Sequence, residues 1–350
     1  MATRRSVLKG AAAVGAASAF PAPFVSAQEP RAKIRLGVVP LISSGQVFLS
    51  RAYGFYDKVN LDVEYSTFAD GALAIPALVA GELDATVSTA NAGLFNTVAR
   101  GSPFRMTFDR GSEKPGSGSM QIVVSNAIHA AGITDVGKFA MLKGKRLYIQ
   151  APGGIDHYLL ATAIEKAGLN PLTDVEWQSG LTYPDMVKAM GVGQCDAANI
   201  PVPLAFLAEK NNVGKLINPG YDIEPNCQLA AWAMPVTFLK SNMSAAIRLA
   251  MCHTWAGRLY NKAAAEKDPA VIKIISEATK VPEPLILAAA PRWTWFHDNG
   301  EPDVESVLKQ GRFWQKMKLA PAIELKPDQV FDLTPPREAA KRLGEKNPFI

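Results

Sequence analysis

Short runs of small and polar residues follow several apolar, strand-like segments of this chain. These runs are 40–46, 68–71, 88–91, 150–157 and 200–203. In an open parallel sheet, ligands bind beyond the carboxyl ends of the strands, where the first turn of the next helix presents free N–H groups. Such N–H groups and the helix dipole stabilise a carboxylate, a sulfonate or nitrate without a full cationic partner. The runs therefore predict a binding site for a small anion.

The candidate ligand-binding residues all lie within or beside these runs. They are Ser44, Gln46, Gly71, Ser88, Thr89, Ala90, Asn91, Gly153, Gly154, Ile155, Asp156 and Pro201. Each type also has an ordinary structural use: Ser or Thr caps helices, and Gly suits turns. For Asp156 we favour the structural interpretation, because an acid in a first helical turn is stabilised by the dipole. For Gln46, ligand contact and exposure to water remain equally open.

Other residues whose side chains could bind an anion or take part in catalysis have simpler structural explanations. Arg110 and Arg292 could pair with an anion, but we expect both to be surface charges. His157 is expected to pack on its helix, and the core is expected to hold Trp232, Trp293 and Trp295. The three cysteines are isolated and odd in number, so they form neither a zinc spacing nor a clear disulfide framework. Nucleophile-elbow, zincin and P-loop motifs are absent from the sequence.

The elements that must position these residues alternate between strand-like and helix-like segments from residue 33 onward. This alternation is typical of a mostly parallel sheet covered by helices. We expect strands at 34–40, 61–68, 85–89, 104–109, 120–125, 146–150, 175–179 and 197–200, and helices at 44–56, 71–81, 90–100, 155–167, 183–192, 202–210, 245–265 and 269–280. The segment 110–119, rich in Gly, Ser and charge, suits a linker or mobile loop.

One short sequence motif, Gly-[Glu/Gln]-x-Asp-Ala, occurs twice, at 81–85 and 193–197. Each copy stands where a helix ends at Gly and an Asp-led turn enters a buried strand. Two lobes of similar build follow from this repeat. We expect the segment after residue 229 to return to the first lobe, so that lobe 1 comprises 28–117 plus 229–350 and lobe 2 comprises 118–228. Two crossings between lobes make a hinge.

Length and composition describe a folded protein with an export signal. The 350 residues are 48% hydrophobic, enough for about two domains. Residues 1–27 combine Arg4-Arg5, an Ala/Gly-rich apolar stretch and a small-residue cleavage site ending at Ala27, the pattern of a twin-arginine signal peptide. A mature protein free in the periplasm, without a lipid anchor or membrane span, is expected. The signal carries three of the five net positive charges, so nucleic acid is not an expected partner.

Several motifs together resemble one known family. They are Ala52-Tyr53-Gly54-Phe55-Tyr56, Leu61-Asp62-Val63-Glu64, Gly81-Glu82-Leu83-Asp84-Ala85, Leu142-Lys143-Gly144-Lys145-Arg146 and His157-Tyr158-Leu159-Leu160. From residue 34 to about 318 the chain resembles the nitrate/sulfonate/taurine-type solute-binding proteins of ABC importers, a group that includes binders of the thiamine pyrimidine precursor. The resemblance implies the type II periplasmic-binding-protein fold, two α/β lobes joined by a two-segment hinge. It also implies a small organic anion in the cleft.

The same resemblance implies that the anion is delivered to an ABC permease and its ATPase by a monomer that performs no chemistry and carries no cofactor or metal. Two alternatives are an enzyme of the thiamine-pyrimidine-synthase type on the same fold, whose Cys-rich tract this sequence lacks, and a ligand-sensing partner of a membrane receptor.

Two departures from the family pattern bear on the ligand. The frequent Gly-Ser-Ser-Ala-His is replaced by Gly153-Gly154-Ile155-Asp156-His157, and Trp-[Asp/Glu]-Pro by Pro201-Val202-Pro203. The first change removes two hydroxyl donors and adds a branched apolar side chain. We therefore expect a carboxylate with an aromatic or branched aliphatic body to bind more tightly than nitrate or taurine.

Overall fold

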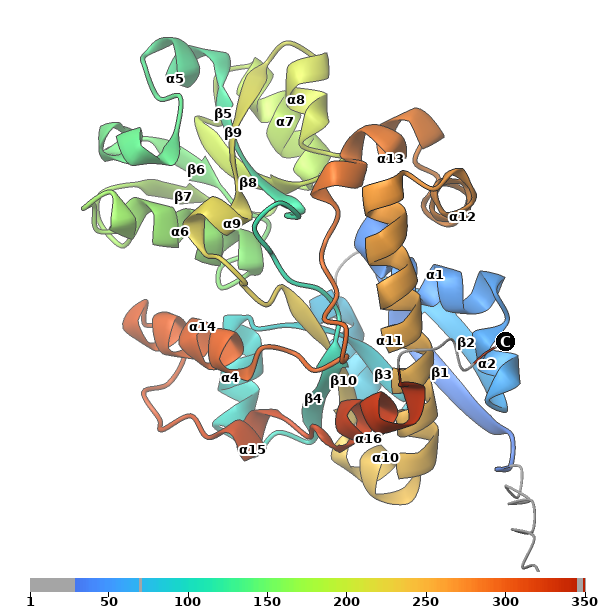
Figure 1. The fold of residues 1–350 in the computed structure, drawn as a ribbon. Helices are drawn as coiled ribbons and strands as arrows, with labels where there is room; N and C mark the ends of the chain where they lie inside the picture. Colours follow the sequence, from blue (N-terminus) through green and yellow to red (C-terminus); the bar gives the residue numbers. More distant parts are fainter. Residues whose placement is uncertain (1–28, 69–70, 345–348, 350) are drawn as a thin grey trace, which may run out of the picture. The chain divides into compact units, whose positions relative to one another are not determined.

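The strands of this protein form two five-stranded sheets, as seen in a computed structural model that describes residues 29–68, 71–344 and 349 (Figure 1). The predicted signal peptide lies outside these described residues. The first sheet has the order β2-β1-β3-β10-β4. Its strands are β1 (Ala32–Val38), β2 (Leu61–Thr67), β3 (Ala85–Thr89), β4 (Phe104–Asp109) and β10 (Ala230–Pro235). Only β10 runs antiparallel to its neighbours, so the sheet is mostly parallel, as the alternation predicts.

The second sheet repeats this arrangement. Its order is β7-β6-β8-β5-β9, and β5 is antiparallel to both of its neighbours. The strands are β5 (Met120–Ser125), β6 (Arg146–Tyr148), β7 (Glu176–Gln178), β8 (Ala197–Pro201) and β9 (Gly214–Pro219). In each sheet the antiparallel strand stands next to the edge and is the first strand after the chain has crossed from the other sheet. The predicted class of two similar α/β lobes is confirmed.

Most of the predicted helices are shorter than the sequence pattern indicates, whereas α11 is longer. The helices are α1 (Gly45–Ala52), α2 (Phe55–Lys58), α3 (Ile75–Val79), α4 (Ala92–Val98), α5 (Asn126–Ala130), α6 (Ile155–Lys166), α7 (Tyr183–Gly191), α8 (Phe206–Lys210), α9 (Gly220–Ile223), α10 (Val236–Ser241), α11 (Met243–Glu266), α12 (Pro269–Thr279), α13 (Glu283–Ala289), α14 (Val304–Lys316), α15 (Pro327–Val330) and α16 (Thr334–Leu343). The expected helix 44–56 is divided because Gly54 adopts a left-handed conformation, φ 66°. The expected helix 202–210 begins only at Phe206, since Pro203 offers no N–H group to a helix interior.

The two copies of the repeated sequence motif form the same turn, one in each lobe. Asp84, just before β3, accepts the N–H of Arg35 at 2.8 Å and bonds its guanidinium at 2.7 Å. Asp196, just before β8, accepts the N–H of Arg146 at 2.8 Å and bonds its Nε at 3.3 Å. Each Asp thus joins the entry of a central strand to the neighbouring parallel strand. The predicted Asp-led entry into a buried strand is confirmed in both places.

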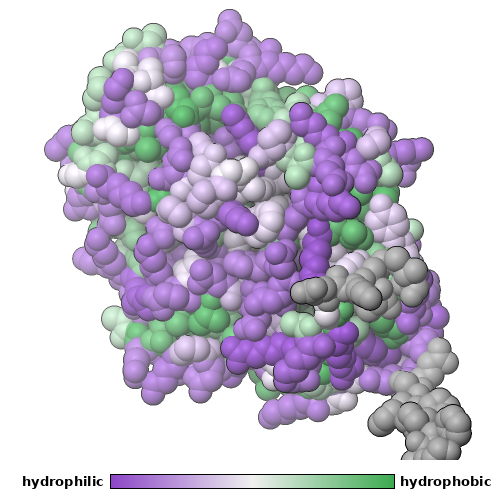
Figure 2. Space-filling view, in the orientation of Figure 1, coloured by the Kyte–Doolittle hydropathy of each residue, from purple (hydrophilic) through white to green (hydrophobic). Residues whose placement is uncertain are grey.

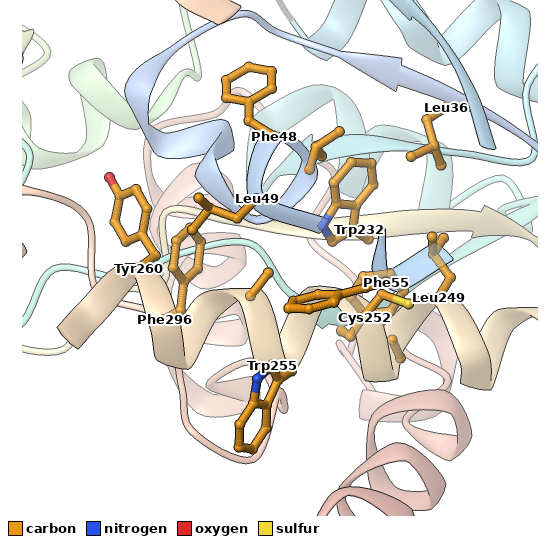
Figure 3. Packing of buried hydrophobic residues seen from close by; sticks show 14 of the residues in the cluster. Leu36, Phe48, Leu49, Phe55, Trp232, Leu249, Cys252, Trp255, Tyr260 and Phe296 are labelled. Carbon is orange, nitrogen blue, oxygen red and sulfur yellow. The ribbon is translucent and has the colours of Figure 1, made fainter. Parts of the chain in front are cut away.

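The core of the first lobe forms between its sheet and the long helix α11 (Figure 3). Trp232 of β10 is fully buried there, as expected. Trp293 is also fully buried, whereas Trp295 is half-buried under the ammonium group of Lys114, 3.5 Å from its ring centre. Figure 2 shows that hydrophilic residues cover most of the visible face, so the apolar groups lie mainly inside.

The chain crosses between the sheets through 110–119 and 224–229, and a third segment, 293–297, runs beside them (Figure 1). Ser112 forms a bridge to Gln228 and another to Trp295. The expected linker 110–119 is thus a real connection, but most of it is buried: Glu113 is 0% exposed and Ser112 is 1% exposed. Backbone pairing with two other segments explains why a Gly- and Ser-rich stretch has a fixed path.

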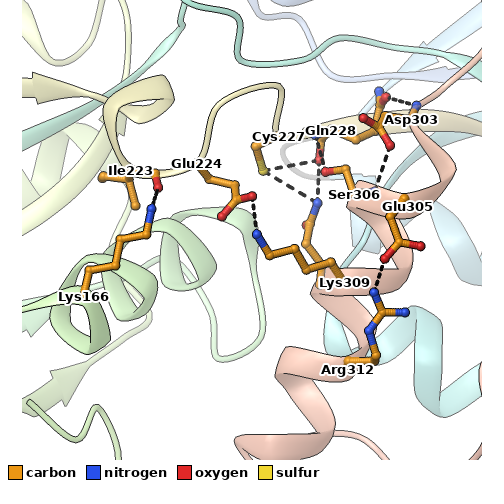
Figure 4. Close-up of polar contacts among 11 residues, drawn as sticks. Lys166, Ile223, Glu224, Cys227, Gln228, Asp303, Glu305, Ser306, Lys309 and Arg312 are labelled. Atoms are coloured by element: carbon orange, nitrogen blue, oxygen red, sulfur yellow. Dashed lines mark hydrogen bonds and ion pairs between the residues drawn. The ribbon is translucent and has the colours of Figure 1, made fainter. Parts of the chain in front are cut away.

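Helix α14, which the sequence pattern did not predict, touches both lobes. On one side it packs against α4. On the other side, its Lys309 pairs with Glu224 at 2.5 Å and Lys316 pairs with Glu165 of α6 at 2.7 Å (Figure 4 shows the Lys309 pair). The second crossing and α6 are therefore tied to the helix that covers the first lobe.

Candidate functional site

The candidate residues lie at or just beyond the carboxyl ends of strands from both sheets. Ser44 and Gln46 follow β1, Gly71 follows β2, and the run 88–91 ends β3 and leads into α4. In the second sheet, the run 153–156 follows β6 and includes the first two residues of α6, and Pro201 ends β8. These are the positions from which the sequence predicts ligand contact.

The N-termini of α4 and α6, one from each lobe, are in direct contact. Asn91 caps α4, and its Oδ1 accepts the N–H of Leu94 at 2.8 Å. The next N–H group, that of Ala92, donates to the carbonyl oxygen of Gly153 at 3.1 Å. Gly153 has φ 82°, and a Cβ there would lie 2.5 Å from that of Ala92. Only glycine fits this approach, and it brings two helix N-termini together across the lobes.

The start of α6 is ordered by its own side chains. Gly154 is the N-cap and supplies no side-chain cap. Asp156 is 2% exposed, and its Oδ2 accepts the N–H of Gln150 at 2.6 Å. Nδ1 of His157 accepts the N–H of Gly153 at 3.0 Å, while its ring packs on Trp177. Burial lowers the pKa of His157 to about 4, so this imidazole is neutral at pH 7 and orders the loop.

Several other candidate residues form local hydrogen bonds or pack closely against neighbouring segments. Thr89 Oγ1 accepts the side-chain amide of Asn91 at 3.0 Å, and the carbonyl oxygen of Ala90 accepts Trp314 Nε1 at 2.8 Å. Gly71 lies so close to β3 that a Cβ would stand 2.7 Å from the carbonyl oxygen of Val87. Ser88 is buried. Ile155 is half-buried and packs against an apolar cluster that draws on both lobes.

Arg110 is not the surface charge that we expected: its side chain is buried, with 5% of the residue exposed. Its Nη2 donates to Ser44 Oγ at 2.7 Å, and that hydroxyl donates to the carbonyl oxygen of Val39 at 2.5 Å. Burial lowers the pKa of Arg110 to about 10, which leaves it charged at neutral pH. The polar composition of 110–119 concealed this burial. Arg292 is exposed, as expected, and donates to Gln121 Oε1 at 3.0 Å.

Gln46 does not face water. It is 2% exposed; its Nε2 lies 3.4 Å from the carbonyl oxygen of Asp109, and its Oε1 lies 3.5 Å from Trp232 Nε1. Both contacts are long, so they hold the amide only weakly.

Asp109 connects the three segments that run between the lobes. Its Oδ1 accepts the N–H of Gly111 at 2.8 Å and the side-chain amide of Gln228 at 2.6 Å. Its Oδ2 accepts the N–H of His297 at 2.7 Å. Burial raises the pKa of Asp109, although these donors oppose the shift. Removing this carboxylate would take away the acceptor of the N–H groups of Gly111 and His297, whereas the Gln228 amide would keep the carbonyl oxygens of Gly111 and Ala230.

Two hollows on the described surface lie away from the candidate residues. One, of about 350 Å³, lies between Arg35, Phe104 and Phe238. Another, of about 420 Å³, lies between Glu301 and Lys341. Among the described residues, no three His, Cys, Asp or Glu side chains are grouped so as to hold a metal ion. Nor does the described part of the chain contain a helix with the length and apolar character needed to cross a membrane.

The three cysteines are free and buried. Burial raises the pKa of each thiol, that of Cys195 to about 12. Because the thiolate is the reactive form, none of these groups is suited to act as a nucleophile.

Comparison with known proteins places these features in context. The model of the NMT1-like family matches residues 27–276. No curated protein matches the chain in sequence.

Solved structures share the fold. A ligand-binding component of an ABC-type import system from Staphylococcus aureus, with zinc bound, has a TM-score of 0.72 and 14% identity, covering 88% of this chain and 98% of its own. The periplasmic nitrate-binding protein NrtA from Synechocystis PCC 6803 has a TM-score of 0.71 and 18% identity, covering 90% and 89%. The alkanesulfonate-binding protein SsuA from Xanthomonas axonopodis pv. citri, bound to MOPS, has a TM-score of 0.67 and 17% identity, covering 86% and 99%. The expected periplasmic-binding-protein fold is confirmed.

Proposed function

The chain belongs to the NMT1-like family, and from this premise we propose that it is the solute-binding protein of an ABC importer, which captures a small organic anion between its two lobes. The observation that carries the proposal is the contact between the N-termini of α4 and α6 through Ala92 and Gly153. Two helix N-termini bring positive dipole ends to one place, where Ala92 and Leu94 already donate their N–H groups to Gly153 and Asn91. A ligand at this contact would have partners on both lobes and would therefore join them.

A carboxylate or a sulfonate is the proposed ligand class. The similar solved structures include proteins described as binding nitrate and an alkanesulfonate. In this chain, Gly154 and Ile155 replace hydroxyl-bearing residues, so the ligand's body would meet an apolar surface. Aromatic or branched aliphatic anions are therefore favoured over nitrate and taurine.

The division into lobes is proposed as 28–117 plus 229–350 for lobe 1 and 118–228 for lobe 2. Sheet membership supports it, because β1 to β4 and β10 share one sheet and β5 to β9 share the other. The bound anion would pass to an ABC permease and its ATPase, and the protein would act as a monomer without catalytic activity. The high pKa values of the buried thiols agree with a binding role.

Export through the twin-arginine route to the periplasm, with cleavage after Ala27, is also proposed. It rests on Arg4-Arg5 and the residues that follow them. Replacing both arginines by lysine should leave uncleaved precursor in the cytoplasm, as measured by cell fractionation and immunoblotting. Normal amounts of mature protein in the periplasm of the double variant would contradict this route.

Ligand binding is tested on the purified mature protein by thermal shift and then by calorimetric titration. The probes are nitrate, taurine, butanesulfonate, benzoate and isovalerate. A probe at a hundred times its dissociation constant should add about 2.7 kcal/mol to the free energy of unfolding. Binding of benzoate, isovalerate or butanesulfonate would support the proposal. If no anion shifts the melting temperature, the proposed function is wrong.

A further inference from the structure

Three buried hydrogen-bond donors near the start of α1 have no acceptor. They are Nε of Arg110, the hydroxyl of Tyr260 and Nε1 of Trp293. Arg110 is 5% exposed, and the other two residues are fully buried. Buried polar groups are nearly always paired, since an unpaired donor forfeits its hydration without replacement. Three such donors in one region indicate that something accepts from them.

The three donors belong to one neighbourhood. The rings of Tyr260 and Trp293 are in contact, with 4.6 Å between their centres and a tilt of 34° between their planes. The Tyr260 ring also lies against Gly45, where a Cβ would stand 2.2 Å from its Cδ2. Arg110 reaches Ser44, the residue immediately before Gly45. Figure 3 shows the hydroxyl of Tyr260 pointing away from α11, the helix that carries it.

The N-terminus of α1 opens into the same neighbourhood. Ser44 occupies the N-cap position, but its side chain makes no capping bond, because its hydroxyl serves Val39 and Arg110 instead. Gly45 begins the eight-residue helix. The positive end of the helix dipole therefore adds to the charge of Arg110.

The charge of Arg110 lacks a carboxylate partner within ion-pairing distance among the described residues. The Asp109 carboxylate favours the charged form of Arg110, but it forms no ion pair with the guanidinium and accepts instead from Gly111, Gln228 and the N–H of His297. His253 is neutral, because burial and Arg110 lower its pKa to about 3. A buried cation without a directly paired counter-ion is costly, and an anionic ligand would supply that partner.

We propose that Arg110, Tyr260 and Trp293 form the subsite that holds the anionic head group of the ligand. The head group is an oxyanion with two or three oxygens, a carboxylate or a sulfonate, since the subsite offers a cation and three donors, of which only the Tyr260 hydroxyl can also accept. This assignment rests on the proposed function and deepens it: a side-chain cation, in addition to backbone N–H groups, selects for charge. A neutral amide of the same shape brings its own N–H donors and should bind much more weakly.

A purely structural role for Arg110 is the competing explanation. In that case the guanidinium only fixes the loop before α1 through Ser44, and its removal would weaken all ligands equally. The two roles separate when an anion is compared with its neutral isostere. We therefore use benzoate with benzamide, and butanesulfonate with butanesulfonamide, in calorimetric titrations of the mature protein.

The expected result is a loss of charge selectivity in Arg110→Gln. Affinity for the anion should fall roughly 30-fold or more, while affinity for the amide stays within about threefold. Tyr260→Phe removes one neutral donor and should weaken anion binding by about two- to tenfold. Arg100→Gln is the matched control, because it removes an exposed arginine of the same lobe outside the candidate site, and it should bind like the wild type.

Each remaining outcome is decisive. If the wild type binds an anion and Arg110→Gln binds it equally well, or loses anion and amide in parallel, the subsite assignment is wrong while the proposed function stands. If the wild type binds no anion, both are wrong. Should circular dichroism show that Arg110→Gln does not fold, Arg110→Lys replaces it. Lys keeps the charge but not the planar set of donors, so anion affinity should fall while the preference for anion over amide persists; loss of that preference would contradict the assignment.

Discussion

Glu113 is a carboxyl group buried within the first crossing between the lobes. It is 0% exposed, its Oε1 accepts the N–H of Met120 at 2.9 Å, and its Oε2 has no partner. Burial raises its pKa to about 8. Since no cation is paired with it among the described residues, the neutral acid is the form that fits this site at pH 7.

Replacing Glu113 by Gln should therefore flatten the pH dependence of stability. The folded pKa lies above the unfolded value, so the stability contributed by Glu113 is fully present below about pH 4.5 and is lost as pH rises through about 8. Within that window the wild type should lose up to about 1.4 kcal/mol per pH unit through this group. Urea unfolding of the wild type and of Glu113→Gln at pH 5, 7 and 9 measures this loss in the free energy of unfolding. A variant whose stability falls as steeply as that of the wild type would contradict the shift.

Ile155 decides whether the body of the ligand meets an apolar surface. Changing Ile155 to Ser should lower affinity for benzoate, because a ring edge covering about 60 Å² of such surface contributes roughly 1.5 kcal/mol, or tenfold. Calorimetry of both proteins measures this, with thermal melting to confirm folding. Because Ile155 also packs against an apolar cluster, equal benzoate affinities would show that its side chain serves the core alone.

Single-residue environments are where the sequence is least informative. The structural role of Asp84 and Asp196 could be predicted, because the residues beside each of them in the sequence are typical of a turn. Arg110 could not, since its burial arises from Ser44 and from the second crossing, which are distant in the sequence. A charged residue between Gly- and Ser-rich neighbours is typical of a surface loop, and only the tertiary pairing of 110–119 overturns that interpretation.

At the scale of elements, the contact between α4 and α6 depends on one glycine. Gly153→Ala would place a methyl group 2.5 Å from the Cβ of Ala92, so the two helix N-termini could not meet as they do. Affinity for the anion should fall roughly tenfold or more, since the closed arrangement becomes less favourable. Titration of benzoate or butanesulfonate measures the change.

Gly168→Ala is the control for backbone strain. Gly168 has φ 81°, nearly the same as Gly153, but a Cβ there has open space around it. Both variants should lose similar stability from the left-handed conformation, about 1 kcal/mol, whereas only Gly153→Ala should lose affinity. Equal losses of affinity in the two variants would mean that strain, not closure, explains the result.

Elements differ in how well the sequence predicts them. Strands β3, β4 and β5 match their predicted ranges, because each is almost entirely buried and bounded by turn residues. Strand β9 was not predicted: it lies at a sheet edge and carries polar residues. Helix α14 was not predicted, because it contains Gly311, a weak helix former. Tertiary packing requires this glycine, since a Cβ there would stand 2.5 Å from the ring of Phe95.

At the scale of the whole molecule, the two lobes are in contact with each other at several points. Ala92 meets Gly153, Arg292 meets Gln121, and α14 pairs with α6 through Lys316 and Glu165. In the last pair the Lys316 side chain is 67% exposed and that of Glu165 is 25% exposed, so solvent screens the pair and its contribution is small. Weak polar contacts of this kind permit opening, whereas a ligand with partners on both lobes would favour the closed state.

Small-angle X-ray scattering of the mature protein should therefore show a smaller radius of gyration with ligand than without it. A compact chain of this length has a radius of gyration of about 20 Å, and the liganded protein should approach that value from above. The probe is whichever of benzoate, isovalerate or butanesulfonate binds in calorimetry, used at saturation. Gly153→Ala, measured at a probe concentration that saturates it, should remain larger than the wild type because its helix N-termini cannot meet. Identical scattering of free and saturated wild type would show that binding proceeds without closure, and the contact between α4 and α6 would then be a fixed feature of the fold.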